Sequence, residues 1–327
     1  MVDIAIIGAG LSGLIAANRL NYIGSVEVFE KSNEVSGRMA TRNSEPFFFD
    51  HGAQYFKIKT HSFRNFLSPM IKDGIIQEWK GTFAEIKNKN IKYLDNTLNN
   101  NIRYVGVPGM NSIGKYLANR INIKLNSEII STIREKNKWC LVDSLGKKSG
   151  RFDWVIVTAP SHQSLQFIIK ETEVYNKVKS IKMNACFSIM LGFDKEIPIK
   201  FNAAEVYDED ISWISVNSSK PGRNKEFCLL INSTNRWADS NIEIDKNYAL
   251  KYLIDKGSDL LNEKLSLAKH KVIHRWKFAN TESRKNYSFL IDRVNNIAVC
   301  GDWLTYSRVE ESFTSSNNMV NELINIL

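Results

Sequence analysis

The chain has 327 residues, a formal charge of +9, 43% hydrophobic residues and 11% aromatic residues. This length exceeds what one hydrophobic core usually organises, so two domains are expected. No run of eighteen apolar residues occurs, which excludes a simple membrane-spanning helix, and Asp3 interrupts any apolar leader at the N-terminus.

The positive charge is dispersed along the chain. Lys and Arg alternate with abundant Asn and Ile, a mixture that argues against a basic stripe for nucleic acid. Cys140, Cys186, Cys228 and Cys300 are far apart, with no CxxC pair and no neighbouring histidine cluster, so reduced buried thiols are expected and a zinc site is not. We therefore expect a cytoplasmic protein with no metal, no nucleic-acid partner and no membrane partner.

The first thirty residues predict a nucleotide-binding unit of strand, glycine turn, helix and strand. Val2–Ile7 is an apolar, β-branched run, and Gly8-Ala9-Gly10-Leu11-Ser12-Gly13 follows it directly. Leu14–Leu20 has helical spacing, and Val26–Glu30 is a second short strand that ends on an acid. This order is the full context that a GxGxxG motif requires before it indicates a dinucleotide site.

Each glycine has a physical role in that unit. Gly8 allows a sharp turn out of the strand, Gly10 leaves room for a pyrophosphate, and Gly13 lets the helix pack close to the sheet. The phosphates are expected on the free N–H groups of the first helical turn, beginning at Leu11 and Ser12.

Glu30 lies twenty-two positions after Gly8, where an acid accepts hydrogen bonds from the adenosine ribose hydroxyls. Lys31 follows and opens a segment, KSNEVSGRMATR, that runs to Arg42. Further along, Phe47–Phe56 has the sequence FFFDHGAQYF. Together with the fingerprint, these two segments resemble the flavin-containing amine oxidase superfamily and, within it, the renalase-like oxidoreductases.

The resemblance implies FAD as cofactor and assigns roles in the first of these segments. Gly37 permits close backbone approach, and Arg38 offers a planar cation for the second phosphate or for the isoalloxazine edge. Met39 follows in the same cofactor-binding turn. The usual motif is Gly-Gly-Arg, whereas this chain has Ser36 in the first position.

The segment after Asp50 is expected to lie against the flavin ring. Gly52 and Ala53 permit close contact, and Gln54 is placed to hydrogen-bond toward the flavin or the substrate. Tyr55 and its neighbour Phe56 are expected either to wall the pocket or to belong to the core. His51 is expected to be a packing histidine, with a role as a base as the alternative.

The middle of the chain predicts a second, interleaved domain. Residues 61–102 combine a helical pattern, a short strand and a polar, Asn-rich loop to Asn101. Residues 103–160 return to the family pattern with RYVGVPGMN and a buried strand at 152–158; in relatives the backbone at Ile130 meets the adenine. From 161 to 290 several strand-like runs and few helices indicate an antiparallel sheet that would cover the flavin.

Within that region, the segment HRWKFA places His274, Trp276 and Phe278 on one face of a strand and Arg275 and Lys277 on the other. Renalase-like proteins carry an H-R-W segment in their substrate domain, which implies a substrate contact for His274. A core histidine is the alternative.

The C-terminal region matches the family's last flavin motif. A strand at 296–300 leads into Gly301-Asp302-Trp303 and then a helix. By resemblance, Asp302 binds a ribityl hydroxyl, and the helix N-terminus at Val309 and Glu310 points N–H groups at the flavin pyrimidine edge.

The predicted fold is α/β, a Rossmann-type FAD-binding domain interleaved with an α+β substrate domain built on an antiparallel sheet. The expected FAD-binding domain comprises residues 1–60, 103–160 and 291–327, and the expected substrate domain comprises 61–102 and 161–290. The expected catalytic residues are His274, Gln54 and Tyr55. The expected cofactor-binding residues are Gly8, Gly10, Leu11, Ser12, Gly13, Glu30, Lys31, Gly37, Arg38, Met39, Gly52, Ala53, Gln54, Ile130, Asp302, Val309 and Glu310.

The renalase resemblance implies oxidation of 2- or 6-dihydro-NAD(P) to NAD(P)+, with dioxygen as acceptor and hydrogen peroxide as product. Hydride loss from a dihydropyridine restores aromaticity and removes no N–H or O–H proton, so a strong base is dispensable. An amine oxidase or desaturase acting on another small molecule is the first alternative. A flavin- or NAD-binding protein without turnover is the second.

Overall fold

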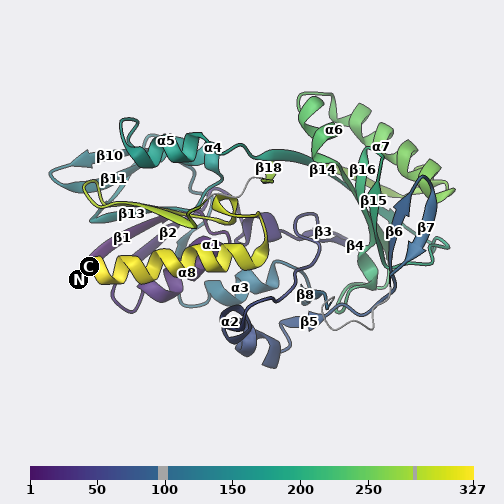
Figure 1. Cartoon of the computed structure of the whole chain (residues 1–327), viewed down its shortest axis with the longest axis horizontal. Helices are drawn as coiled ribbons and strands as arrows, with labels where there is room; N and C mark the ends of the chain where they lie inside the picture. The colour runs from purple at the N-terminus through teal and green to yellow at the C-terminus, as the bar shows by residue number, and fades with distance from the viewer. Residues whose placement is uncertain (95–101, 283–285) are drawn as a thin grey trace.

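The computed structural model describes residues 1–94, 102–282 and 286–327, in which two large sheets are joined by crossing segments (Figure 1). The first sheet has the order β19-β20-β13-β1-β2-β9. All neighbours run parallel except β19 and β20. Its strands are β1 (Val2–Ile7), β2 (Gly24–Phe29), β9 (Asn122–Lys124), β13 (Trp154–Val157), β19 (Phe289–Asp292) and β20 (Ile297–Cys300).

Alternation along β1 explains why both faces of this sheet are covered. Ile4 and Ile6 belong to one core, and Ala5 and Ile7 to another on the opposite face. The first face carries helices α1 (Leu11–Leu20) and α8 (Val309–Ile326), which lie side by side, and α3 (Ser112–Ala118) packs on α1. The second face carries a small sheet of β10 (Ile129–Glu135), β11 (Lys138–Asp143) and β12 (Lys148–Phe152), with α4 (Ser161–Ser164) and α5 (Glu173–Lys179).

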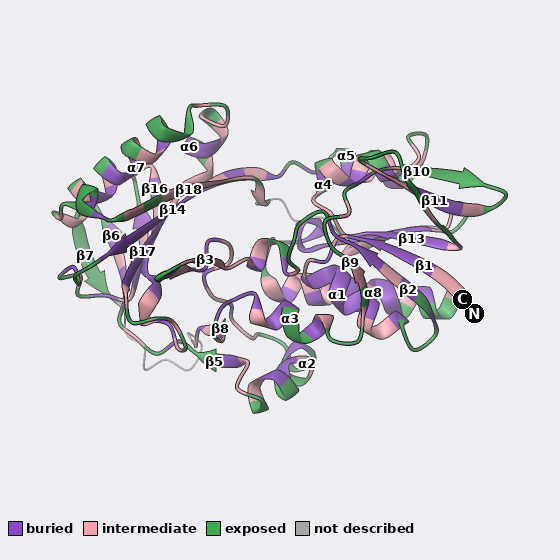
Figure 2. Cartoon of the chain, turned by 180° about the vertical axis from the view of Figure 1, so that it is seen from behind, coloured by how far each residue is buried: buried purple, intermediate pink, exposed green. Residues whose placement is uncertain are grey.

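The second sheet has the order β18-β14-β17-β16-β15-β6-β7, and every pair is antiparallel except β15 with β6. Its outer face packs against α6 (Asn235–Ser240) and α7 (Lys246–Leu261). Seen from behind, the strands in the middle of both sheets are buried, whereas the edge strand β7 is exposed (Figure 2). The strands are β6 (Phe83–Lys87), β7 (Asn90–Tyr93), β14 (Asn184–Phe193), β15 (Ala203–Tyr207), β16 (Ile211–Val216), β17 (Phe227–Ser233) and β18 (His270–Asn280).

Two short pairs and one helix connect the sheets. Strand β3 (Arg42–Ser44) pairs with β4 (Phe47–Phe49), and β5 (Ile76–Glu78) pairs with β8 (Tyr104–Gly106). Helix α2 (His61–Lys72) lies beside α8. These connections place residues 40–60 between the two sheets, and this position brings them to the cavity described below.

The α/β fold class and the antiparallel character of the second sheet are confirmed. The observed packing differs from the expected domain boundaries at two segments. Among the described residues of 61–102, only β6 and β7 join the second sheet. Helix α2 packs on the first domain instead, where Phe63 contacts Phe313 of α8 with tilted rings and 5.3 Å between their centroids. Residues 161–181 belong to the first domain, because the apolar face of α5, with Val174 and Val178, packs on the first sheet.

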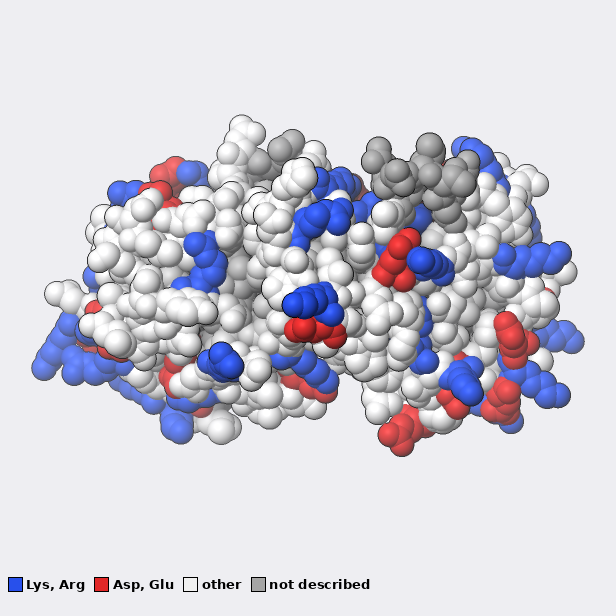
Figure 3. Space-filling view, turned by 90° about the horizontal axis from the view of Figure 1, so that it is seen from below, with Lys and Arg blue, Asp and Glu red and all other residues white. Residues whose placement is uncertain are grey.

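The expected polar loop to Asn101 contains two strands up to Tyr93, and its remainder lies partly outside the described residues. Ile123 of β9 pairs with Val28 at the edge of the first sheet. Across residues 1–94, 102–282 and 286–327, none of the helices is long and apolar enough to cross a bilayer. On the face seen from below, Lys and Arg are scattered among Asp and Glu, as the sequence indicates (Figure 3).

Candidate active site

A cavity of about 1410 Å³ lies between the two sheets. Single-ligand pockets are usually about 300–1,000 Å³, so this cavity is larger than a typical single-ligand pocket. We divide it into three parts by the residues that line them. The nucleotide end has Gly8, Gly10–Ser12, Glu30–Lys31, 127–129 and 158–160; the central part has Gly37–Arg42, His51–Ala53, Cys186, Ser188, Asn232, His274, Trp276, Asp302 and Val309–Ser312; the far end has Tyr55, Lys57, Lys59, Glu205 and Arg308.

The glycine turn shapes the nucleotide end. A Cβ on Gly10 would meet no atom within 4 Å, so the backbone is open to the cavity there. Gly10 also caps α1 without any side-chain hydrogen bond, which leaves the first N–H groups of the helix to a ligand. Gly8 has φ of +109°, and its Cβ would lie 2.7 Å from Oγ1 of Thr158, so a side chain is excluded on both grounds.

Glu30 lies at the end of β2, as expected, and is only 8% exposed. Its two carboxylate oxygens accept hydrogen bonds from the N–H groups of Ala9, at 2.8 Å, and Ser32, at 2.9 Å. These bonds fix the carboxylate beside the glycine turn with lone pairs remaining for hydroxyl donors. Lys31 also lines this end and is exposed.

Three residues expected at the cofactor, Gly13, Ile130 and Gln54, do not line the cavity. Gly13 acts through packing, because a Cβ there would lie 2.0 Å from the carbonyl oxygen of Gly8. Ile130 is 45% exposed, and its neighbour Ile129 lines the cavity instead, since successive residues of a strand face opposite sides.

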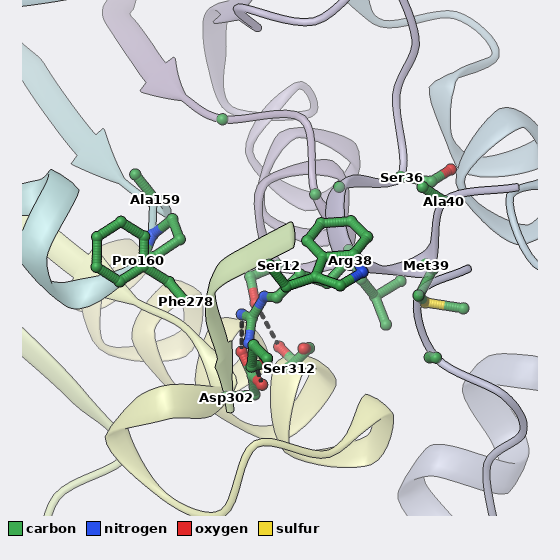
Figure 4. Close-up of a pocket in the computed structure, with 18 of the residues that line it drawn as sticks. Ser12, Ser36, Arg38, Met39, Ala40, Ala159, Pro160, Phe278, Asp302 and Ser312 are labelled. Carbon is green, nitrogen blue, oxygen red and sulfur yellow. Dashed lines mark hydrogen bonds and ion pairs between the residues drawn. The ribbon is translucent and has the colours of Figure 1, made fainter. Parts of the chain in front are cut away.

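Arg38 and Asp302 form a bidentate ion pair in the central part (Figure 4). The Asp302 side chain is 7% exposed, and Arg38 also donates to the carbonyl oxygen of Ala279 at 3.1 Å. The sequence predicted separate roles for the two residues at phosphate and ribityl groups. In the structure the two residues instead bind each other, and this ion pair forms one side of the cavity. It links the segment after β2 to the turn after β20.

Gln54 does not line the cavity either, and its amide is fully used by the protein. Nε2 donates to the carbonyl oxygens of Asp50 and Gly52, and Oε1 accepts from Oγ of Ser215 at 3.0 Å and Nζ of Lys220 at 3.3 Å. Its role is therefore to hold the loop that carries Gly52 and Ala53, both of which line the cavity.

The central part is roofed by side chains from β18, β14 and β17 that lie in register. Ser188 pairs with His274 on one side and with Asn232 on the other, so all three share one sheet face. The His274 and Trp276 rings are 4.3 Å apart, and Trp276 Nε1 donates to the carbonyl oxygen of His51 at 2.9 Å. The His51 ring stacks on Trp276 at 5.4 Å.

Burial keeps both imidazoles of the roof neutral. Desolvation, helped by the nearby cation Arg42, lowers the pKa of His274 to about 4. Desolvation, followed by the neighbouring His274 and Arg42, lowers the pKa of His51 to about 3. Both side chains are therefore neutral hydrogen-bonding groups and weak bases at neutral pH.

The far end lies beyond the roof, where Tyr55 packs on Trp213 with 5.5 Å between ring centroids. Burial raises the pKa of Tyr55, so its hydroxyl stays protonated. Glu205 accepts a hydrogen bond from the hydroxyl of Tyr207 at 2.9 Å. The cations of this part are Lys57, Lys59 and Arg308.

Comparison with known proteins begins at the glycine turn. Residues 6–69 match the NAD(P)-binding Rossmann-like domain. A 52-residue stretch is 50% identical to 4,4'-diapophytoene desaturase from Staphylococcus aureus (strain Newman), covering 16% of this chain and 10% of that enzyme. The match thus spans about a tenth of the length of the curated relatives.

Solved structures match along the whole chain. A putative protoporphyrinogen oxidase from Exiguobacterium sp. 255-15 has a TM-score of 0.78 at 12% identity, with 98% of each chain covered. Putrescine oxidase bound to putrescine has a TM-score of 0.72 at 12% identity, with 99% of each covered. The CLA-producing fatty acid isomerase from P. acnes has a TM-score of 0.73 at 11% identity, with 98% of each covered.

The chain has the fold of the FAD-dependent oxidoreductases. Its cavity suits FAD, because the lining residues continue from the Rossmann end into the central part. The Arg38 and Asp302 pair, Gly52 and Ala53 all lie along this continuation. FAD would be held by the α1 N-terminus, Glu30 and this ion pair.

The N-terminus of the C-terminal helix borders the cavity at the two residues named from the sequence, Val309 and Glu310. Val309 lines the cavity at the N-terminus of α8. Glu310 also borders it, but its carboxylate accepts from the N–H groups of Lys59 and Thr60, both at 2.8 Å. Its side chain therefore fixes the start of α2 relative to α8.

Sequence reasoning missed Ser188, Asn232, Glu205, Lys57, Lys59 and Arg308. They come from five separate segments, and only the register of β18, β14 and β17 shows that His274, Ser188 and Asn232 meet. Across the described parts of the chain, no group of His, Cys, Asp and Glu could hold a metal ion.

Proposed function

We propose that the protein is a cytoplasmic FAD-dependent oxidase that takes a hydride from isomeric 2- or 6-dihydro-NAD(P). FAD supplies the hydride acceptor when bound and passes two electrons to dioxygen. One dihydronicotinamide, one dioxygen and one proton then give NAD(P)+ and hydrogen peroxide.

The observation that carries this proposal is the character of the central part. Two neutral imidazoles and one indole, from His51, His274 and Trp276, face the cavity together. They suit a flat ring that carries a carboxamide and loses a hydride. The lowered pKa values of both imidazoles leave weak bases, and this reaction removes no N–H or O–H proton from the substrate.

The chain's own residues orient and enclose the reactants. His274 is placed to hydrogen-bond the carboxamide, while Trp276, held by its bond to the His51 carbonyl, fixes the plane of the substrate ring. The N-terminus of α8 at Val309 supplies a positive dipole end where negative charge develops. The Arg38 and Asp302 pair keeps its own charges balanced beside the cofactor.

Amine oxidation is the second candidate, and Glu205 is the observation that favours it. An acid in the cavity is a partner for a cationic amine, and putrescine oxidase is among the structures with this fold. Lys57, Lys59 and Arg308 line the same part as Glu205, however, and these cations oppose a positively charged substrate. The balance favours the anionic dinucleotide.

The proposal is tested by anaerobic mixing of the purified holoprotein with 2-dihydro-NAD, 6-dihydro-NAD and a panel of amines. We expect loss of the flavin absorption band near roughly 450 nm with at least one dihydronicotinamide. Bleaching by amines alone would establish the second candidate. A protein without bands near roughly 370 and 450 nm, or with a flavin that no compound reduces, contradicts the proposed oxidase.

A further inference from the structure

The far end of the cavity continues the polar row that begins at His274. Across β17, β16 and β15, Trp213 pairs with Asn232 and Glu205 pairs with Trp213. Residues paired in this way lie on one face of the sheet, so the row runs from His274 and Ser188 to Glu205. A ligand that starts beneath His274 can therefore extend along the sheet to Glu205.

The groups at the end of this row have the chemistry of a nucleotide site. Tyr55 lines the cavity, and its ring is supported by Trp213 with 5.5 Å between ring centroids, so the Tyr55 ring gives an aromatic surface for a base. Glu205 offers carboxylate oxygens to sugar hydroxyls.

The far end of the cavity also contains cationic side chains. Lys57, Lys59 and Arg308 come from two segments and line the far end together. Burial, followed by the nearby cations Arg103, Lys59 and Arg308, lowers the pKa of Lys57, while Glu205 opposes that shift. The acids around them are Glu205, Glu310 and Glu311, and Glu310 is already engaged by the N–H groups of Lys59 and Thr60. A diphosphate would be attracted to this part.

We propose that the far end binds the ADP-ribose portion of the dihydronicotinamide dinucleotide, so that the enzyme selects dinucleotides over mononucleotides. This inference rests on the proposed function. The cofactor's own diphosphate belongs at the α1 N-terminus, at the opposite end of the cavity, so the far end is a second nucleotide site.

The experiment compares a dihydro-NAD isomer with the matching dihydronicotinamide mononucleotide on the holoprotein. We expect the wild-type kcat/KM to be roughly tenfold or more higher for the dinucleotide than for the mononucleotide. The difference should arise from a lower KM for the dinucleotide. In Arg308→Gln, and in Arg308→Gln combined with Lys57→Gln, that preference should fall towards one, because kcat/KM falls more for the dinucleotide than for the mononucleotide. Calorimetric titration of the holoprotein with NAD+ and ADP-ribose should show the same loss of affinity.

A matched control removes two cations from the opposite face of the second sheet, Arg236→Gln on α6 and Lys251→Gln on α7, both highly exposed. This control should keep the full preference. If wild type oxidises both compounds equally, or the far-end variants lower both kcat/KM values equally, the proposed function stands and the far-end assignment is overturned. If neither compound reduces the flavin, the proposed function is wrong and this inference fails with it.

Discussion

At the scale of single residues, Glu30 is the most specific contact that the sequence predicts for the cofactor. It is buried at the end of β2 and fixed by the N–H groups of Ala9 and Ser32. Glu30→Gln keeps one acceptor oxygen and loses the charge, so Ala9 or Ser32 must face an amide NH₂. Hydrogen bonds to charged groups contribute about 1.5–3 kcal/mol each, so we expect FAD affinity to fall about tenfold to a hundredfold.

Reconstitution of the apoprotein, followed by flavin fluorescence, measures this change. Glu34→Gln is the control, because Glu34 also borders the cavity but its side chain is half exposed in a 3.5 Å ion pair with Lys115. Equal FAD affinity in the two variants would show that Glu30 makes no contact with the cofactor.

The two imidazoles of the roof predict a pH-dependent stability. Their folded pKa values, about 3 for His51 and about 4 for His274, lie below the ordinary value of 6.5. Between these values the unfolded chain binds more protons than the folded chain, so the free energy of unfolding falls as the pH falls from about 6.5 to about 4. One proton contributes about 1.4 kcal/mol per pH unit.

Urea unfolding between about pH 7 and about pH 5 tests this prediction. We expect the stability of His51→Gln to decline less steeply with falling pH than that of wild type. Parallel curves for the two proteins would mean that His51 is not buried in its neutral form.

Residues of the site could be predicted only where their chemistry is local. The roles of Gly8, Gly10 and Glu30 follow from one stretch of thirty residues, because the order of strand, glycine turn, helix and strand determines where each of them lies. Gln54 could not be placed in this way, since its partners Ser215 and Lys220 lie more than 160 positions along the chain. Without those partners, a glutamine beside a flavin motif is indistinguishable from a ligand contact.

At the scale of elements, the alternation of side chains along β18 predicts which of them lie on each face of the sheet. His274 and Trp276 face the cavity, whereas Arg275 lies over the Phe187 ring at 5.3 Å on the opposite face. The pattern predicted this division without knowledge of the neighbouring strands. It did not predict β6 and β7, because both strands are short and the edge strand β7 is fully exposed, with the composition of a loop.

The same strand provides a paired prediction. Trp276→Leu removes the indole that bonds the His51 carbonyl and flanks His274, so we expect kcat/KM for the dihydronicotinamide to fall by roughly tenfold or more. Lys271→Gln, on the other face with its Nζ donating to the Ser266 carbonyl at 2.8 Å, should leave kcat/KM unchanged. Steady-state oxidation under air measures kcat/KM for both variants. Equal losses in the two would show that Trp276 does not contact the substrate.

At the scale of the whole molecule, a buried charge cluster joins the two domains. Asp50 accepts from Lys220 at 3.1 Å and from Arg223 at 2.6 Å, and all three side chains are at most 1% exposed. Asp50 also accepts from the N–H of Met110, at 2.9 Å, and these contacts hold its pKa at about 2 despite burial. The cluster fixes the loop of Gly52 and Ala53 between the sheets. The shape of the cavity therefore depends on contacts among three segments that are distant in sequence, those of Asp50, of Met110, and of Lys220 and Arg223.

Removal of the acid should therefore damage stability and cofactor binding together. Asp50→Asn leaves two buried cations without their counter-charge, and breaking a buried pair in this way costs about 3–5 kcal/mol of unfolding free energy. Urea unfolding with bound and with removed FAD measures that loss, and cofactor content reports the position of the loop. Glu135→Gln is the control, because its ion pair with Lys148 is exposed and should contribute nothing measurable. If Asp50→Asn unfolds at the wild-type urea concentration and retains FAD, the domains are held by their apolar contacts alone.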